Sequence, residues 1–88
     1  MTYKFLNITE ELTSKKNPDQ HFHIVSVLRK AGPRDNVRGS VVCDQIFISP
    51  EQRKLFKDID SGDGIELVYE DYGRYRDLVD VNIVDADF

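Results

Sequence analysis

Residues 49–56 read Ser-Pro-Glu-Gln-Arg-Lys-Leu-Phe, and this stretch divides the chain into a part before a helix and a part after it. Ser49 is a helix-capping residue, Pro50 suits the first helical position, and Gln52 stands where a capping box needs it. Such side chains satisfy free backbone amides, and Glu51 complements the helix dipole. The stretch therefore predicts the start of a helix.

The predicted helix is short. It runs from about Pro50 to Asp58, and the turn residues 61–64, Ser-Gly-Asp-Gly, lie beyond its end. Three apolar side chains at helical spacing form the face that we expect to pack on a sheet. They are Leu55, Phe56 and Ile59.

Five other stretches are rich in apolar and β-branched residues and predict strands. They are Tyr3–Ile8, Phe22–Leu28, Ser40–Ile48, Ile65–Glu70 and Leu78–Val84. The second stretch is apolar at both parities, which favours a central strand covered on both faces. Residues 13–20 and 31–36 are rich in turn formers and are predicted as loops, and Gly73 suits a hairpin turn between the last two strands.

The predicted order is β-β-β-α-β-β, in a single domain of residues 1–88. This order resembles the five-stranded oligonucleotide/oligosaccharide-binding (OB) barrel, whose helix lies between the third and fourth strands. The resemblance lies in element order and length, because that fold has no short residue signature. It implies a mainly β (α+β) fold: a five-stranded OB-like barrel or curved antiparallel sheet with one short helix between strands 3 and 4. At the level of the fold, the chain is similar to small single-strand-binding proteins of phages and plasmids.

Composition fits an ordinary globular protein, with 40% apolar and 32% charged residues. No apolar run approaches the roughly 18 residues of a membrane-spanning helix. The first residues turn polar at once, so no signal peptide is expected. The single cysteine, Cys43, cannot form an internal disulfide, which suits a reducing compartment, and we expect a soluble cytoplasmic protein.

The formal net charge of −4 is unevenly distributed. Residues 1–43 contain seven Lys or Arg and four Asp or Glu, whereas residues 44–88 contain five and twelve. Such an asymmetry is typical of an interaction surface. In a small sheet, however, the two halves of a sequence interleave in space, so the asymmetry need not survive folding.

Aromatic and basic side chains gather in the predicted last hairpin, in the second strand and in the loop after it. Proteins that bind single strands need flat rings for the bases and cations for the phosphates. The candidate nucleic-acid-binding residues are Arg34, Arg38, Tyr69, Tyr72, Arg74, Tyr75 and Arg76. The second strand adds His21, His23, Arg29 and Lys30. Tyrosines also favour strands and arginines favour surfaces, so a small β protein carries some of both without any such function.

The acidic second half of the chain supports an alternative. Four carboxylates interrupt the tyrosine–arginine cluster and would repel phosphate, whereas an acidic face attracts a basic partner and steers its approach. The candidate protein-binding residues are Glu66, Glu70, Asp71 and Asp77. In size and charge the chain resembles small acidic phage and mobile-element proteins that inhibit host nucleic-acid enzymes. The same acids would also keep a small domain soluble.

The sequence contains no motif for a metal, a cofactor or catalysis. His21 and His23 share one face of a strand, but nothing fixes zinc geometry around them. Residues 58–69 depart from a calcium loop at its sixth and twelfth positions. Cys43 stands mid-strand, where a cysteine is usually a small core residue. We therefore expect a non-enzymatic single-stranded nucleic-acid-binding protein without cofactor or metal, with an acidic protein-interaction module or inhibitor as the alternative.

Self-association is expected as well. Five short strands without a disulfide leave sheet edges that must be covered, charged or paired. Phe88 is an apolar residue that follows residues 85–87, Asp-Ala-Asp, a run that we expect to be exposed. The sequence thus predicts a homodimer, formed by edge pairing or by docking of Phe88.

Overall fold

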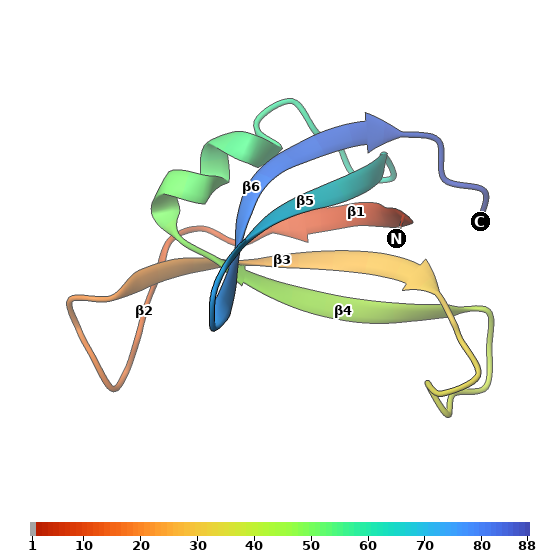
Figure 1. Ribbon diagram of the computed structural model, residues 1–88, viewed down its shortest axis with the longest axis horizontal. Helices are drawn as coiled ribbons and strands as arrows, with labels where there is room; N and C mark the ends of the chain where they lie inside the picture. The colour runs from red at the N-terminus through yellow and green to blue at the C-terminus, as the bar shows by residue number, and fades with distance from the viewer. Residues whose placement is uncertain (1) are drawn as a thin grey trace.

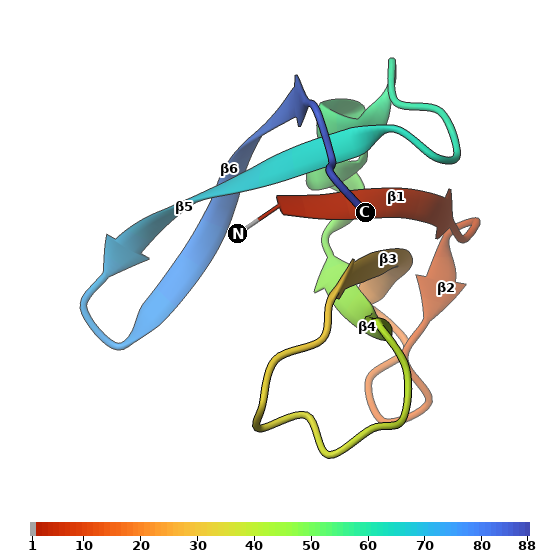
Figure 2. The ribbon, with the colours of Figure 1, turned by 90° about the vertical axis from the view of Figure 1, so that its right-hand side faces the viewer.

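The computed structural model describes residues 2–88, which form a curved antiparallel sheet with one short helix (Figures 1 and 2). The strands are β1 (Thr2–Ile8), β2 (Leu12–Thr13), β3 (His21–Lys30), β4 (Val41–Ile48), β5 (Gly64–Tyr72) and β6 (Tyr75–Val84). The helix η1 (Pro50–Phe56) is a 3-10 helix between β4 and β5. The mainly β class and the position of the helix are therefore as predicted.

The long strands lie in the order β4-β3-β1-β5-β6, and β2 pairs with the first two residues of β3. Of the two predicted arrangements, a five-stranded OB-like barrel and a curved antiparallel sheet, the closed barrel does not form, because the sheet has six strands and β4 does not pair with β6 in residues 2–88. The open curved sheet is the arrangement that forms. The two arms of the sheet, β3–β4 and β5–β6, are joined through β1, which pairs with both β3 and β5. On the open side, η1 packs against both β3 and β6, so side chains rather than hydrogen bonds fill the space between the arms.

The start of η1 follows the sequence pattern. The backbone N–H of Gln52 donates to Ser49 Oγ (3.4 Å), and the N–H of Ser49 donates to Gln52 Oε1 (2.8 Å), which completes a capping box. The side-chain amide of Gln52 also donates, through Nε2, to the carbonyl of Leu78 (2.9 Å) and therefore connects the cap to β6. The helix ends at Phe56, earlier than the predicted Asp58.

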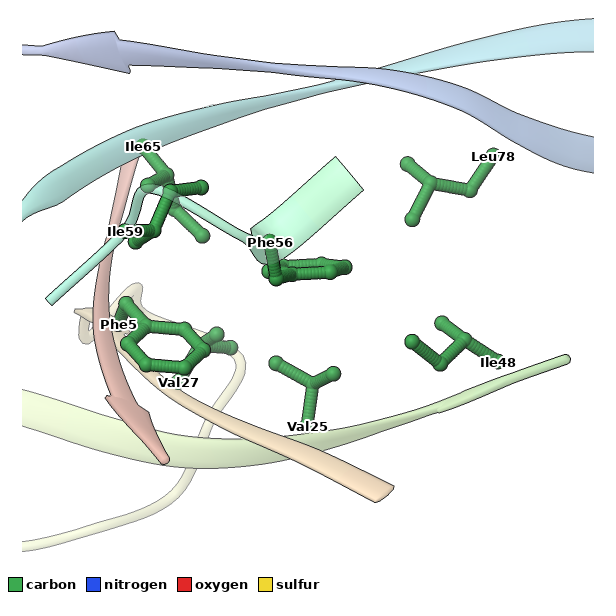
Figure 3. Close-up of a cluster of buried hydrophobic side chains, with 8 residues drawn as sticks. All are labelled: Phe5, Val25, Val27, Ile48, Phe56, Ile59, Ile65 and Leu78. Atoms are coloured by element: carbon green, nitrogen blue, oxygen red, sulfur yellow. The ribbon is translucent and has the colours of Figure 1, made fainter. Parts of the chain in front are cut away.

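The core lies between the two arms of the sheet, with the ring of Phe56 in the middle (Figure 3). Its buried side chains are Phe5, Val25, Val27, Ile48, Phe56, Ile59, Ile65 and Leu78. The ring of Phe56 stacks on that of Phe5, with centroids 5.9 Å apart. Phe56 and Ile59 are buried as predicted, whereas Leu55 is only partly buried at the margin of the core.

The two faces of β3 differ. Val25 and Val27 point inward and have no exposed surface, whereas Phe22, Ile24 and Leu28 lie on the outer face and are partly exposed. The central position of β3 is confirmed by its pairing with β1 and β4, but the predicted cover on both faces is wrong. The reason is that the single helix packs on the inner face, and the described chain has no second layer for the outer one.

Cys43 belongs to that outer face, because it pairs with Leu28 across the sheet. Residues directly opposite each other in an antiparallel pair project to the same side. The thiol is exposed, so the expectation of a core cysteine is wrong. Alternation along β4 decides the outcome, since Val42 and Asp44, on either side of Cys43, take the inward positions.

Two glycines are required by the backbone. A Cβ on Gly64 would lie 2.3 Å from the carbonyl oxygen of Val84, so β5 and the end of β6 approach closely only without a side chain there. Gly73 has a φ of 72° and begins the two-residue turn between the paired residues Tyr72 and Tyr75. The hairpin turn is therefore where the sequence predicts it.

Truncation of the central ring tests this core directly. Phe56→Ala should lower the free energy of unfolding by about 3–5 kcal/mol, because the ring is 4% exposed and fills the space between the arms. Ser49→Ala should cost about 0.5–2 kcal/mol through loss of the cap. Chemical denaturation gives both values. Phe47→Ala is the control, since that ring is 66% exposed, and it should stay within about 0.5 kcal/mol of the unsubstituted protein. Equal midpoints for Phe56→Ala and Phe47→Ala would contradict the assigned core.

Candidate nucleic-acid interface

The tip of the β5–β6 hairpin carries the tyrosines and arginines that the sequence analysis singles out. The rings of Tyr72 and Tyr75 stack on each other, with centroids 5.7 Å apart, and both are exposed. The guanidinium of Arg76 lies over the ring of Tyr69 (4.9 Å to the centroid). Partial burial raises the pKa of Tyr69, and the charge of Arg76 opposes this rise. The hairpin thus presents rings in contact with an arginine.

Acidic groups occupy the same tip and reduce its attraction for phosphate. Arg76 Nε lies 3.1 Å from Asp71 Oδ1, so part of its charge is neutralised. The hydroxyl of Tyr72 donates to the carboxylate of Glu70, which raises the pKa of that tyrosine. Residues 69–77 contain three acids and two arginines, a net charge of −1. The hairpin therefore supplies stacking surface with little positive potential.

The loop between β3 and β4 is held by an arginine of β3. The two terminal nitrogens of Arg29 donate to the two carboxylate oxygens of Asp35 (2.7 and 2.8 Å), and its Nε donates to Asp44 (2.5 Å). The N–H of Gly32 also donates to Asp35 (2.6 Å). The hydrogen bonds from Arg29 to Asp35 and Asp44 raise the pKa of Arg29. Arg29 therefore anchors the loop, and its charge is balanced within the protein.

The structure does not bring the whole predicted set together. Arg34 and Arg38 lie in the loop between β3 and β4, and both views place that loop away from the tip of the β5–β6 hairpin (Figures 1 and 2). One strand of nucleic acid held by the hairpin is therefore not also enclosed by these two arginines. The tyrosines Tyr69, Tyr72 and Tyr75 and the arginines Arg74 and Arg76 do share one hairpin.

A second aromatic surface lies on the outer face of β3 and β4. The rings of Phe22 and Phe47 are almost parallel, with an interplanar angle of 6° and centroids 5.6 Å apart. They belong to a pocket of about 400 Å³, which we call the Phe22–Phe47 pocket. Its lining consists of Ser14, Gln20, His21, Phe22, Phe47, Ile48 and Ser49. The lining has no carboxylate, and its polar groups are hydroxyl, amide and imidazole.

The loop beside this pocket is closed by backbone hydrogen bonds. The N–H of Ser14 donates to the carbonyl of Gln20 (3.0 Å), and the N–H of Gln20 donates to that of Asn17 (2.9 Å). Both pocket-lining ends are thereby fixed, and Lys15 and Lys16 are exposed between them. Two exposed lysines thus follow Ser14, a residue of the pocket lining.

The two histidines of β3 have different surroundings. His23 is buried and its Nδ1 donates to the carbonyl of Thr9 (2.9 Å), because the backbone oxygen can only accept. His21 is exposed, with Nδ1 3.2 Å from Thr13 Oγ1 and 3.9 Å from Glu11. Cys43 projects from the opposite face of the sheet to His23, so these groups do not converge. Across residues 2–88, no group of three or more His, Cys, Asp or Glu side chains could hold a metal ion.

The predicted acidic residues also separate into two groups. Glu66, Glu70 and Asp77 project from the outer face of β5 and β6, together with Asp80. Asp71 lies at the other parity and contacts Arg76. The outer face of this hairpin is therefore acidic, and part of the charge asymmetry along the sequence survives folding.

The Phe22–Phe47 pocket was not predicted from the sequence. A phenylalanine in a strand usually belongs to the core, and Phe22 and Phe47 stand among other apolar residues. Only the cross-strand register, which pairs Ile24 with Phe47, places the two rings on the outer face. The strict alternation of inward and outward side chains along β4, with Val42 and Ile46 facing inward, is the sequence signal that could have placed Phe47 on the outer face.

Comparison with protein-family models, with curated proteins and with solved structures found no match. Within residues 2–88, no helix has the length and apolar character needed to cross a membrane.

The anchor of the β3–β4 loop predicts an acid dependence. Hydrogen bonds from Arg29 and from the N–H of Gly32 lower the pKa of Asp35 from 3.8 to about 2. A lowered pKa in the folded state means that this contact stabilises the fold above about pH 4, and that the contribution disappears as the pH falls towards 2. The melting temperature of Asp35→Asn should lie below that of the unsubstituted protein at neutral pH, and the difference should close near pH 2.

Asp19→Asn is the matched control, because Asp19 is an exposed acid without an ion pair among residues 2–88. It should melt with the unsubstituted protein across the same range of pH. A difference between Asp35→Asn and the unsubstituted protein that stays constant down to pH 2 would contradict the assigned ion pair.

Proposed function

We propose that this protein binds single-stranded nucleic acid without catalysing a reaction, and that a base enters the Phe22–Phe47 pocket. The observation that carries the proposal is the parallel, solvent-accessible pair of rings in a pocket whose polar lining groups are hydroxyl, amide and imidazole. Bases of every sequence have a flat π face, so aromatic platforms hold single strands with little sequence preference. A duplex keeps its bases stacked on each other and would not fill this pocket.

The size and chemistry of the pocket suit a base. Its volume of about 400 Å³ lies within the range of roughly 300–1,000 Å³ for small-ligand pockets. The side chains of Gln20, His21 and Ser49 offer both donors and acceptors to the edge of a base. Lys15 and Lys16 stand beside the pocket, where they would meet the flanking phosphates.

The order of the strands supports the same reading. The OB fold is a partly open five-stranded barrel that binds oligonucleotides on the face of its second and third strands. Here β3 and β4 are the second and third long strands, and they carry Phe22 and Phe47. The likeness to single-strand-binding proteins of phages and plasmids remains part of the proposal.

The acidic outer face of β5 and β6 favours one further candidate. Glu66, Glu70, Asp77 and Asp80 project from one surface, and such a surface attracts a basic protein partner. The second candidate function is thus an acidic interaction module or inhibitor that acts on a basic partner. The two functions use opposite charges and different strands, so variants can separate them.

We propose a cytoplasmic protein, because its exposed thiol at Cys43 suits a reducing compartment. We also propose a homodimer. Edge pairing is the route that we favour, because the ring of Phe88 lies 5.2 Å from Lys4 Nζ of its own chain.

Removal of one ring tests the proposed function. Phe47→Ala should weaken binding of a labelled oligothymidylate by about 1–3 kcal/mol, which corresponds to about five- to 150-fold in Kd. Fluorescence anisotropy at low salt measures it, and Phe47→Tyr should retain most of the affinity because it keeps a stacking ring. Ile83→Ala is the matched control, since Ile83 is 59% exposed and lies on β6.

Three results bear on the alternatives. Loss of affinity in Tyr75→Ala together with full affinity in Phe47→Ala would move the site to the β5–β6 hairpin. A folded protein that binds no oligothymidylate at low salt would overturn the proposal. Loss of capture of a basic partner in Glu66→Lys/Asp80→Lys would then support the acidic surface.

A further inference from the structure

A groove that the sequence analysis does not identify lies between η1 and the end of β1. It has a volume of about 590 Å³. Its lining consists of Phe5, Ile8, Pro50, Arg53, Lys54, Phe56, Lys57 and Ile59. The aromatic floor belongs to the core, and the side chains nearest to solvent are basic.

The charge of this groove has one sign. Arg53, Lys54 and Lys57 line it, whereas no Asp or Glu does. None of the three cations forms an ion pair within residues 2–88, in contrast to Arg29 and Arg76. In a chain of net charge −4, three unpaired cations over an apolar floor are an uncommon local concentration. Charge complementarity therefore points to an anionic occupant.

The linings of the groove and of the Phe22–Phe47 pocket include neighbouring residues at the junction of β4 and η1. Ser49 lines that pocket and Pro50 lines the groove, so a single peptide bond separates the two linings. The capping box fixes this junction, because Ser49 and Gln52 hold each other through two hydrogen bonds. A nucleic-acid strand that passes from Ser49 to Pro50 would meet no carboxylate of either lining.

We infer that the groove along η1 holds the sugar–phosphate backbone of the same single strand whose base occupies the Phe22–Phe47 pocket. This inference rests on the proposed function and adds the path of the strand. A phosphodiester chain has one negative charge per nucleotide, which matches successive cations on one helix. Lys54 lies in the last turn of η1, and Lys57 is its C-cap, whose backbone N–H donates to the carbonyl of Lys54 (3.3 Å), so these two cations follow each other at the spacing of one 3-10 turn.

The path also explains why the hairpin is a poorer track. Residues 69–77 have a net charge of −1, and Arg76 is paired with Asp71. In Figure 2, the β5–β6 hairpin and β2 lie on opposite sides of the molecule, so the strand held beside β2 runs away from the hairpin. The strand therefore follows η1 rather than β5 and β6.

Two triple variants of equal charge test the path. The first, Arg53→Gln/Lys54→Gln/Lys57→Gln, removes the cations of the groove. The second, Arg34→Gln/Arg38→Gln/Arg74→Gln, removes three cations of the set predicted from the sequence. Lysine, arginine and glutamine have similar helix propensities, and the melting temperature of each variant checks its fold. Binding of oligothymidylate is measured from low to high salt.

The groove variant should make the negative slope of log affinity against log salt less steep by about 2, because each lost phosphate contact removes about 0.7 from its magnitude for a single strand. The control variant should leave the slope nearly unchanged. With a thymidine dinucleotide, which fills the pocket alone, the two variants should bind equally. Oligothymidylate should also protect Lys54 and Lys57 from acetylation, and leave Lys4 reactive.

Equal losses of slope in both triple variants would overturn the inference, since they would reflect net charge alone. An unchanged slope in the groove variant, with Phe47→Ala still impaired, would overturn the path and leave the proposed function intact. Absence of binding by the folded, unsubstituted protein would overturn both.

Discussion

The packing of Phe56 between the two arms of the sheet is the interaction on which the rest of the structure depends. β4 and β6 do not pair, so hydrogen bonds alone leave the sheet open. The ring of Phe56 stacks on Phe5 and lies among side chains of both arms (Figure 3). A chain of 88 residues buries little apolar surface, and one central aromatic ring is a large part of it. The short helix is therefore the element that fills the open side between the arms, which β1 joins by hydrogen bonds on the other side.

The candidate site follows from the same constraint. Because Phe56 must reach the core, η1 begins directly after β4, and the capping box holds Ser49 at that junction. The end of β4 then presents Phe47 outward on one side of the junction, and η1 presents its cations on the other. The hydrogen bond from Gln52 to Leu78 fixes the helix against β6. Pocket and groove are thus adjacent because η1, whose Phe56 fills the space between the arms of the sheet, begins at the end of β4.

Local patterns in the sequence predicted local structure well. The cap at Ser49, the turn at Gly73 and the positions of the long strands each depend on residues that are close together in the chain. The open seam, the two-residue strand β2 and the bulge after Phe5 depend on packing between distant segments, and no local pattern specifies them. For the candidate site, the stacking tyrosines could be found by type, whereas Phe47 could not. Its role depends on the face of β4, which the register with β3 decides.

The distribution of charge shows the same difference between what the sequence predicts and what the fold decides. Counts along the sequence identified an acidic second half, and the outer face of β5 and β6 is acidic, yet Arg53, Lys54 and Lys57 belong to that half and form the basic groove.

Titration of the isotope-labelled protein with oligothymidylate, followed by backbone amide NMR shifts, is the most direct test of the proposed pocket and groove. We predict chemical-shift changes at the amides of Phe22, Phe47, Ser49 and Lys54, and unchanged shifts at the amides of Tyr72 and Tyr75. Shifts confined to the β5–β6 hairpin, or none at saturating oligonucleotide, would contradict it.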